Sequence, residues 1–224
     1  MWLNQFEFAG YYVAKEKGFY KDVGLDVEIK EFKQDFYLTD TVLNGNTDFG
    51  VNSSSIIMDK ANGKDIVLLG TIFQSSPLIL LALKDSNINN LNDMVDKKIM
   101  LANNQKDFGI FRSMFRNQDI DPNYLTFVPH TFKIDDLINK NTDVMSAYST
   151  NELFLVKEKG YETTIFDPKD FGFDFYDDIL FTSNEFAEKN PQLVKDFYDA
   201  SIKGWEYSFN NIEEVSKLIY EKYN

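Results

Sequence analysis

The sequence has no cysteine and a single histidine among its 224 residues. Without cysteine there are no disulfide bonds, no thiolate nucleophile and no Cys-based metal site. The single histidine, His130, has no second histidine beside which to hold zinc, and a lone histidine in a loop is usually exposed or bonded locally. Calcium held by carboxylates alone stays an alternative, but no loop has the EF-hand spacing. No cofactor and no metal are therefore predicted.

Long hydrophobic runs and an excess of basic charge are also missing. The longest apolar stretch, PLILLAL at residues 77–83, has the length of a strand, whereas a helix needs ~20 apolar residues to cross a bilayer. Lys and Arg number 23 against 36 Asp and Glu, which gives a formal net charge of -13, so the chain repels polyanions. We therefore expect no membrane insertion of this part of the chain and no nucleic-acid partner.

A signal peptide is not visible either, because Met1 is followed at once by Trp2, without a basic and an apolar region. The protein is then either cytoplasmic or shown in a mature or shortened form without leader or anchor. The apolar strand that we expect before Trp2 looks cut short, which favours the shortened form.

What the sequence does contain is the material of a globular α/β protein. Hydrophobic residues make up 43% and aromatic residues 16% of the chain, enough for a large core or for an aromatic-lined pocket. Its first part alternates helices and strands. Helices are predicted at residues 9–21, 39–45 and 55–63, and strands at 25–29, 48–51 and 66–73. This order predicts a sheet with mostly parallel strands and right-handed crossovers.

A second α/β set follows at residues 78–175. After it come a strand at 178–183 and helices at 184–190, 191–210 and 212–223. These last helices have no strands of their own, so they should pack back on the first set. The chain would then cross twice between two lobes. We predict lobe 1 at residues 1–77 plus 179–224 and lobe 2 at 78–178, joined by a two-crossing hinge with a central ligand cleft.

Several segments, taken in order, resemble the NMT1/THI5-like (SsuA/THI5-like) family. They are QFEFAGYYVAKEKGFYKDVGLDVEI, VLNGNTDFGV, FQSSPLILLALKDSNI, YSTNELFLV and ASIKGWEYS. The resemblance implies the type II periplasmic binding protein fold, in which two α/β lobes close on a small ligand. It also implies ligands such as thiamine-precursor pyrimidines or sulfonates.

The QFxFAGYY opening is similar to extracytoplasmic input domains of bacterial sensor kinases and cyclic-dinucleotide enzymes, and to solute-binding components of ABC importers. The resemblance thus implies a bacterial protein that acts outside the cytoplasm, in the periplasm or at the cell surface. Its partners would be a small-molecule ligand and either an ABC permease or covalently linked kinase or cyclase domains.

In open α/β sheets, ligands bind beyond the carboxyl ends of the strands, where loops lead into helices. Five predicted loops fit this description, WLNQFEF, NSSS, FQSSP, ANNQKD and YSTNE, and FGFDFYDD adds a rim. The candidate ligand-binding residues are Trp2, Gln5, Glu7, Phe8, Tyr11, Ser53, Ser54, Gln74, Ser75, Ser76, Asn104, Tyr148, Asn151, Glu152, Phe175 and Asp178.

The first loop offers the richest chemistry. Trp2 and Phe8 could stack on a flat ring, and Tyr11 could present its hydroxyl. Glu7 could accept a hydrogen bond from a ring amine or pair with a cation. These side chains together suit a neutral or cationic heterocycle.

Each candidate also has a structural alternative. Trp2 and Phe8 could belong to the core, as we expect for three other aromatic residues, Phe6, Tyr12 and Phe19. The candidate serines could be caps or turn residues. Glu152 begins a helix, where the helix dipole favours an acid anyway, and Asp178 could lie in a solvated turn.

Two classes of function compete. A binding module for an amine-bearing heterocycle, such as a thiamine-precursor pyrimidine, fits the aromatic and acidic loops. A sulfonate or another small solute is the alternative, although the loops contain no Arg and only ANNQK offers amides with Lys106. Some eukaryotic relatives of the fold look like pyrimidine synthases that use a cysteine-rich motif, but this chain has no cysteine and no visible nucleophile–base pair. We therefore predict a binding protein and not an enzyme.

Overall fold

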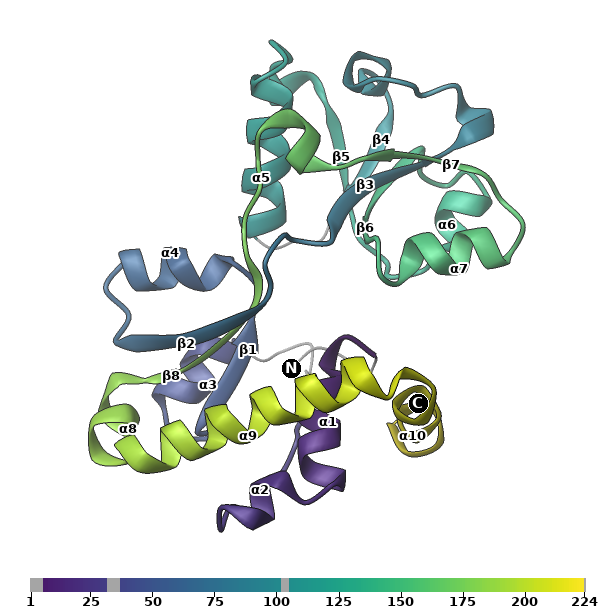
Figure 1. Cartoon of the computed structure of the whole chain (residues 1–224). Coiled ribbons are helices and arrows are strands. Elements are labelled where there is room, and N and C mark those ends of the chain that lie inside the picture. The colour runs from purple at the N-terminus through teal and green to yellow at the C-terminus, as the bar shows by residue number, and fades with distance from the viewer. Residues whose placement is uncertain (1–5, 32–36, 102–104, 224) are drawn as a thin grey trace. The chain divides into compact units, whose positions relative to one another are not determined.

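The computed structural model describes residues 6–31, 37–101 and 105–223. The chain divides into two compact units, each with its own sheet (Figure 1). Unit 1 comprises residues 1–72 and 178–224, and unit 2 comprises residues 73–177. Unit 1 is therefore built from two stretches of sequence that unit 2 separates.

Unit 1 contains one sheet, several short helices and one long helix. Its first stretch holds the 3-10 turn η1 (Phe6–Phe8), α1 (Ala9–Glu16), α2 (Phe19–Asp22), α3 (Leu38–Leu43), β1 (Phe49–Asn52), α4 (Ser55–Ala61) and β2 (Ile66–Phe73). Its second stretch holds β8 (Asp177–Ser183), α8 (Asn184–Lys189), α9 (Pro191–Asn210) and α10 (Ile212–Tyr223). The helices predicted at 191–210 and 212–223 are confirmed. Pro191 stands at the first turn of α9, where a helix does not need the missing N–H.

The helices α1 and α9 pack unusually close together because glycines stand at their contact. A Cβ atom added at Gly204 in α9 would lie 2.0 Å from the carbonyl oxygen of Gly10 in α1. A Cβ added at Gly10 would lie 2.3 Å from the Trp205 ring. A hydrogen bond of 2.8 Å between Tyr20 and Ser201, both buried, adds to the attachment of α9.

The sheet of unit 1 has the order β1-β8-β2, and β1 runs antiparallel to β8. The predicted strand at residues 25–29 belongs to no sheet within the described part of the chain. Leu25, Val27 and Ile29 do pack against the core while the residues between them are exposed, so the predicted alternation is confirmed. A strand needs a neighbour for its backbone hydrogen bonds, and this segment instead lines a hollow of about 1160 Å³ together with β1. The predicted strand at residues 25–29 is therefore wrong, because the segment pairs with no other strand among the described residues.

Unit 2 surrounds a five-stranded sheet of order β5-β4-β6-β3-β7. Its strands are β3 (Leu78–Leu83), β4 (Lys98–Leu101), β5 (Thr126–Pro129), β6 (Val144–Tyr148) and β7 (Thr163–Phe166). Its helices are η2 (Lys84–Ser86), η3 (Leu91–Met94), α5 (Gln105–Arg116), η4 (Pro122–Tyr124), α6 (Asp135–Ile138), α7 (Glu152–Glu158) and η5 (Pro168–Phe171).

The strand β3 shows how the apolar run in the sequence is used. All six of its residues are buried. Leu78, Leu80 and Ala82 face the core that contains Phe111 of α5, whereas the alternate residues face a second core that contains Val156 of α7. Successive side chains of a strand point to opposite faces, so a continuous apolar run fits a strand that is covered on both sides.

The described strand pairs run in both directions. Mostly parallel order is predicted for the first set of strands, but β8 lies between β1 and β2 of that set, so for these two strands the order stays a prediction. β4 runs parallel to β5 and β6, but β3 runs antiparallel to β6 and β7, and β1 to β8. Helical crossovers between neighbouring strands produce parallel pairs. β3 and β8 instead begin where the chain passes from one unit to the other, so no such crossover sets their direction.

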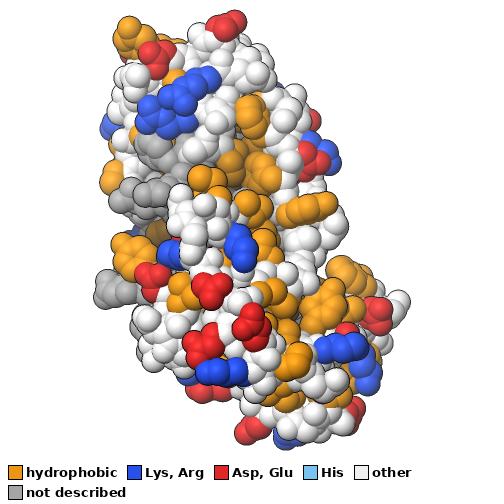
Figure 2. All heavy atoms as spheres, turned by 90° about the vertical axis from the view of Figure 1, so that its left-hand side faces the viewer, with side chains coloured by type: hydrophobic (Ala, Val, Ile, Leu, Met, Phe, Trp, Pro, Cys, Tyr) orange, Lys and Arg blue, Asp and Glu red, His pale blue; other side chains and the backbone are white. Residues whose placement is uncertain are grey.

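The surface carries mixed charge. On the face drawn in Figure 2, Asp and Glu side chains lie close to Lys and Arg side chains, and hydrophobic side chains also reach the surface. No helix within residues 6–31, 37–101 and 105–223 is both long and apolar enough to cross a membrane.

Candidate functional site

The predicted ligand-binding residues divide between the two units. Trp2, Gln5 and Asn104 lie outside the described residues. The others stand in the turn before α1 and in α1 itself, in the loops after β1 and β2, from the end of β6 to the start of α7, and just before or at the start of β8. Those after β1 and β6 lie at the carboxyl ends of their strands, the position at which α/β sheets bind ligands.

In the turn before α1, one phenylalanine is buried and the other is exposed, the reverse of the expected placement of Phe6. Phe8 is 1% exposed and belongs to the core of unit 1, which favours the core alternative over the ligand wall. Phe6, which we expected in the core, is 51% exposed, because Phe8 takes the inward position of this single turn. Tyr12 is buried as predicted, and Phe19 packs at the edge of the same core. Glu7, between the two phenylalanines, is half-buried.

Tyr11 is a buried phenol in a polar setting. Burial raises its pKa well above the ordinary value, and Tyr20 and the Asp178 carboxylate raise it further. Its ring meets the edge of Trp205 at 6.0 Å between centroids. Neither the Tyr11 hydroxyl nor the Trp205 indole nitrogen completes a hydrogen bond of normal geometry with a described residue. Buried polar groups normally find partners, so the two groups of this pair depend on each other.

The serine after β1, Ser53, bonds to Ser55, the first residue of helix α4. The Ser53 and Ser55 hydroxyls are 2.9 Å apart, and the Ser53 amide donates to the Asn52 side chain. Ser54 occupies the cap position of α4, but its side chain makes no capping bond. The prediction that these serines cap the helix is therefore not met at Ser54.

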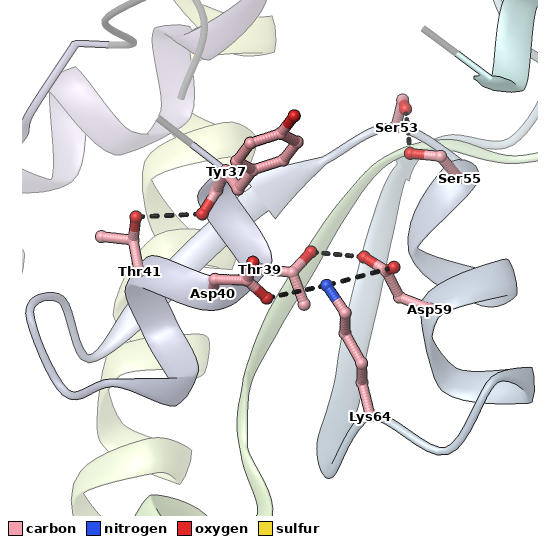
Figure 3. Close-up of polar contacts among 8 residues, drawn as sticks. All are labelled: Tyr37, Thr39, Asp40, Thr41, Ser53, Ser55, Asp59 and Lys64. Atoms are coloured by element: carbon pink, nitrogen blue, oxygen red, sulfur yellow. Dashed lines mark hydrogen bonds and ion pairs between the residues drawn. The ribbon is translucent and has the colours of Figure 1, made fainter. Parts of the chain in front are cut away.

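A network of charges near these serines holds α3 against α4 (Figure 3). Lys64 contacts Asp40 of α3 at 2.8 Å and Asp59 of α4 at 3.4 Å. Thr39 donates a hydrogen bond of 2.6 Å to Asp59. The hydrogen bond to Asp40 is the main cause of the raised pKa of Lys64. The network fixes the two helices that flank β1.

In unit 2 the structure brings two candidates together on a buried carboxylate. Asp177 is fully buried and accepts hydrogen bonds from the Ser76 hydroxyl at 2.7 Å and from the Tyr148 hydroxyl at 3.3 Å. The Ser76 amide donates to the Phe175 carbonyl oxygen at 2.8 Å. Ser76 and Tyr148 thus meet at one anionic group, although they stand far apart in the sequence.

The neighbouring candidates have partners of their own. Ser75 donates to Asp174 and accepts from Lys169 at 3.3 Å, and the preceding Gln74 is exposed. Lys169 also lies 3.7 Å from Asp174. The positive charge beside Ser75 is therefore already balanced by an acid.

Glu152 closes the turn between β6 and α7. Its carboxylate accepts a hydrogen bond of 2.8 Å from the Tyr148 amide, and the Asn151 side chain donates to it at 3.4 Å. An acid at a helix start has this role whether or not a ligand binds. Both Asn151 and Glu152 remain partly exposed.

Asp178 combines burial with an unusual backbone. It is 6% exposed, and its φ of 48° lies in the left-handed region, which is costly for a residue other than glycine. Such strain persists where the surrounding structure requires it and is common at functional sites.

The described groups can bind and orient a solute but form no metal site. No three acidic or histidine side chains within residues 6–31, 37–101 and 105–223 are placed to hold an ion. The hollow in unit 1 includes Tyr11 but none of the other candidates. From the sequence we expect Asp177 on the rim of the cleft or in a solvated turn, whereas the structure buries it fully. The sequence assigns no role to Trp205, because its contacts are tertiary and no local pattern signals them.

Comparison with known proteins gives a consistent result. A family model described as NMT1/THI5 like matches residues 5–215. The 4-amino-5-hydroxymethyl-2-methylpyrimidine phosphate synthase of Legionella pneumophila is 28% identical over 92% of this chain and 67% of its own. The formylaminopyrimidine-binding protein of Halalkalibacterium halodurans is 21% identical over 93% of this chain and 64% of its own. This chain thus spans about two thirds or less of the length of these relatives.

Among solved structures, the periplasmic aliphatic sulphonate binding protein SsuA from Escherichia coli superposes with a TM-score of 0.76. The superposition covers 98% of this chain and 76% of that one, at 14% identity. At this identity the likeness concerns the fold. It confirms the predicted α/β fold of the type II periplasmic binding proteins.

Proposed function

Because the chain belongs to the NMT1/THI5-like family, we propose that it is a solute-binding protein for a small, amine-bearing heterocycle such as a thiamine-precursor pyrimidine. The observation that carries the proposal is the family match, which extends over residues 5–215. A relative that is named for binding formylaminopyrimidine and aligns over 93% of this chain supports it.

The charges beside the predicted loops favour an amine over an anion. Glu7 and Glu152 are both partly exposed, and a carboxylate is a strong acceptor for an exocyclic amine. Lys169, which bonds to the candidate Ser75, is paired with Asp174. A sulfonate would need a free cation or several amide donors, so it is the second candidate and not the first.

We infer that the chain binds its ligand without converting it. One relative is named as a synthase, so turnover has to be tested. His130, the only histidine, uses both ring nitrogens in hydrogen bonds to the backbone at 2.7 and 2.8 Å and is therefore poorly placed to act as a general base. Product formation from a pyrimidine or pyridoxal compound by the purified protein would reverse this inference.

A binding screen tests the ligand class. Formylaminopyrimidine, 4-amino-5-hydroxymethyl-2-methylpyrimidine, thiamine, taurine and free amino acids are compared by calorimetry and thermal shift. A ligand at 100 times its Kd stabilises the folded protein by about 2.7 kcal/mol, which a melting curve detects readily. Binding of a pyrimidine and not of taurine is the expected result. Binding of taurine alone would move the assignment to sulfonates.

Two carboxylate variants test the placement of the site. Glu7→Gln and Glu152→Gln should each weaken pyrimidine binding by roughly 10-fold or more, because hydrogen bonds to charged groups contribute about 1.5–3 kcal/mol. Glu158→Gln, at the exposed far end of α7, is the matched control and should bind like the wild type. If Trp2→Ala and Glu7→Ala both leave the affinity unchanged, the first loop is not part of the site.

We propose that the protein acts outside the cytoplasm, either delivering its ligand to an ABC permease or serving as the input domain of a transmembrane signalling protein. The full-length gene separates these roles. A transmembrane helix followed by a kinase or cyclase domain would identify a sensor, and a neighbouring permease gene would identify an importer.

A further inference from the structure

Phe132 in unit 2 combines a strained backbone, an exposed side chain and a ring contact. Its φ of 60° lies in the left-handed region, which strongly disfavours a bulky side chain. Its side chain is nevertheless 53% exposed, so burial does not compensate the strain. It also lies on the ring of His130, with the two centroids 4.7 Å apart and the planes inclined by 34°.

His130 holds this conformation in place from both ring nitrogens. Its Nδ1 accepts a hydrogen bond of 2.8 Å from the Phe132 amide, and its Nε2 lies 2.7 Å from the Ser146 carbonyl oxygen of β6. One nitrogen must accept and the other must donate, which defines a neutral tautomer. Burial lowers the pKa of His130, in agreement with a neutral ring. The strained turn is therefore attached to the middle of the sheet.

The position of this turn in the sheet matches that of a binding loop. His130 follows β5 directly, and its amide donates to the carbonyl oxygen of Leu101 at the end of β4. β4 is parallel to both β5 and β6, so the carboxyl ends of the three strands share one edge. Tyr148, at the end of β6, and Glu152 belong to that edge. Ligands of open α/β sheets bind there.

We propose that Phe132 is a ligand-contacting residue that stacks on a flat heterocyclic ring, and that His130 is the positioning residue that holds it ready. This rests on the proposed function for the class of ligand, but it adds a residue that neither the family match nor the strand-to-helix loops of the sequence identified. An exposed aromatic ring that is fixed before binding loses little conformational entropy when it stacks. The backbone strain is then part of the binding apparatus.

The key variant separates strain from stacking. Phe132→Gly should leave the melting temperature close to that of the wild type, because glycine adopts positive φ without strain. Its affinity for formylaminopyrimidine should fall roughly 3- to 10-fold, the amount that a stacked aromatic pair contributes. Lys140→Gly is the matched control, since Lys140 has the same φ of 60° but precedes β6, at the opposite edge of the sheet. It should keep the wild-type affinity.

The role of His130 is tested by a double-mutant cycle in the full chain. His130→Ala should weaken binding, but in the Phe132→Gly background the same change should have no further effect on affinity. Additive losses would show that His130 acts on the ligand or on stability by another route and would overturn its positioning role.

The outcomes distinguish this inference from the proposed function. If the wild type binds formylaminopyrimidine and Phe132→Gly binds it equally well, Phe132 is not a ligand contact, and the proposed function stands. If the wild type binds taurine and no pyrimidine, a stacking role is overturned together with the ligand class. Loss of affinity in Phe132→Gly with an unchanged melting temperature supports the inference.

Discussion

Substituting Gly204 by alanine should weaken unit 1 through a clash at the contact between α1 and α9. The added methyl group would lie 2.0 Å from the Gly10 carbonyl oxygen and 3.0 Å from the side chain of Ala14. The first of these atoms belongs to the backbone of a buried helix, so it cannot move aside as a flexible side chain would. The two helices would have to separate.

Two opposing effects determine how much Gly204→Ala changes the free energy of unfolding. Overpacking a core costs about 1–3 kcal/mol and occasionally more, and a clash with backbone belongs at the upper end. Replacing glycine by alanine inside a helix stabilises the helix by about 1 kcal/mol, because alanine has the higher helix propensity. We therefore expect Gly204→Ala to lower the free energy of unfolding by about 2 kcal/mol. This corresponds to a melting temperature lower by about 4–8 °C for a chain of this size.

Tryptophan fluorescence during chemical denaturation measures this effect selectively. The only two tryptophans, Trp2 and Trp205, both belong to unit 1. Circular dichroism follows both units. The matched control is Gly109→Ala in α5, where an added Cβ meets no atom within 4 Å, and propensity alone should keep or raise stability. If Gly204→Ala is as stable as the wild type, the reasoning from helix contact is refuted.

Three other predictions concern bonds between distant parts of the chain. Ser201→Ala should lower the unfolding free energy by about 1–3 kcal/mol because it leaves the buried Tyr20 hydroxyl without the partner that now lies at 2.8 Å; adding Tyr20→Phe should recover much of the loss in denaturation curves. The hydrogen bond from Lys222 lowers the pKa of Glu16. The stabilisation by the Glu16 carboxylate is therefore present above its unfolded-state pKa and is lost as pH falls through its folded-state pKa. Glu16→Gln should flatten the acid side of a curve of stability against pH, and an unchanged curve would contradict the assignment. Lys64→Met should cost about 1 kcal/mol, and less at high salt, because Asp40 and Asp59 are still in contact with solvent, with side-chain exposures of 52% and 30%. Melting curves at two salt concentrations check this.

The sequence predicts the fold well where local signals and burial agree. The long helix α9 has a proline at its first turn and one apolar face, and the apolar run of β3 fits a strand buried on both faces. It fails where pairing decides the result. The segment Leu25–Ile29 has the alternation of a strand, but among the described residues no neighbour bonds to its backbone. The direction of β3 likewise depends on how the chain passes between units and not on its own residues.

The candidate site is predictable at the level of loops and not of side chains. The rule that ligands lie beyond strand ends makes Tyr148 and Glu152 candidates from the sequence alone. It could not show that Tyr148 and Ser76 both bond to Asp177, because hydrogen bonds between distant segments leave no periodic trace. It also passed over Phe132, whose distinguishing feature is a backbone angle.

The division of unit 1 into two stretches has a consequence for biosynthesis. A ribosome adds about 5–20 residues per second, and domains tend to fold as their last residues emerge. Unit 2 is continuous in sequence and can complete its sheet while α9 has still to be made. Until α9 is made, the side chains of α1 that are buried in the folded protein remain exposed to solvent. The partly synthesised chain is thus prone to aggregate through α1, which chaperones that shield nascent chains would have to cover until α9 is made.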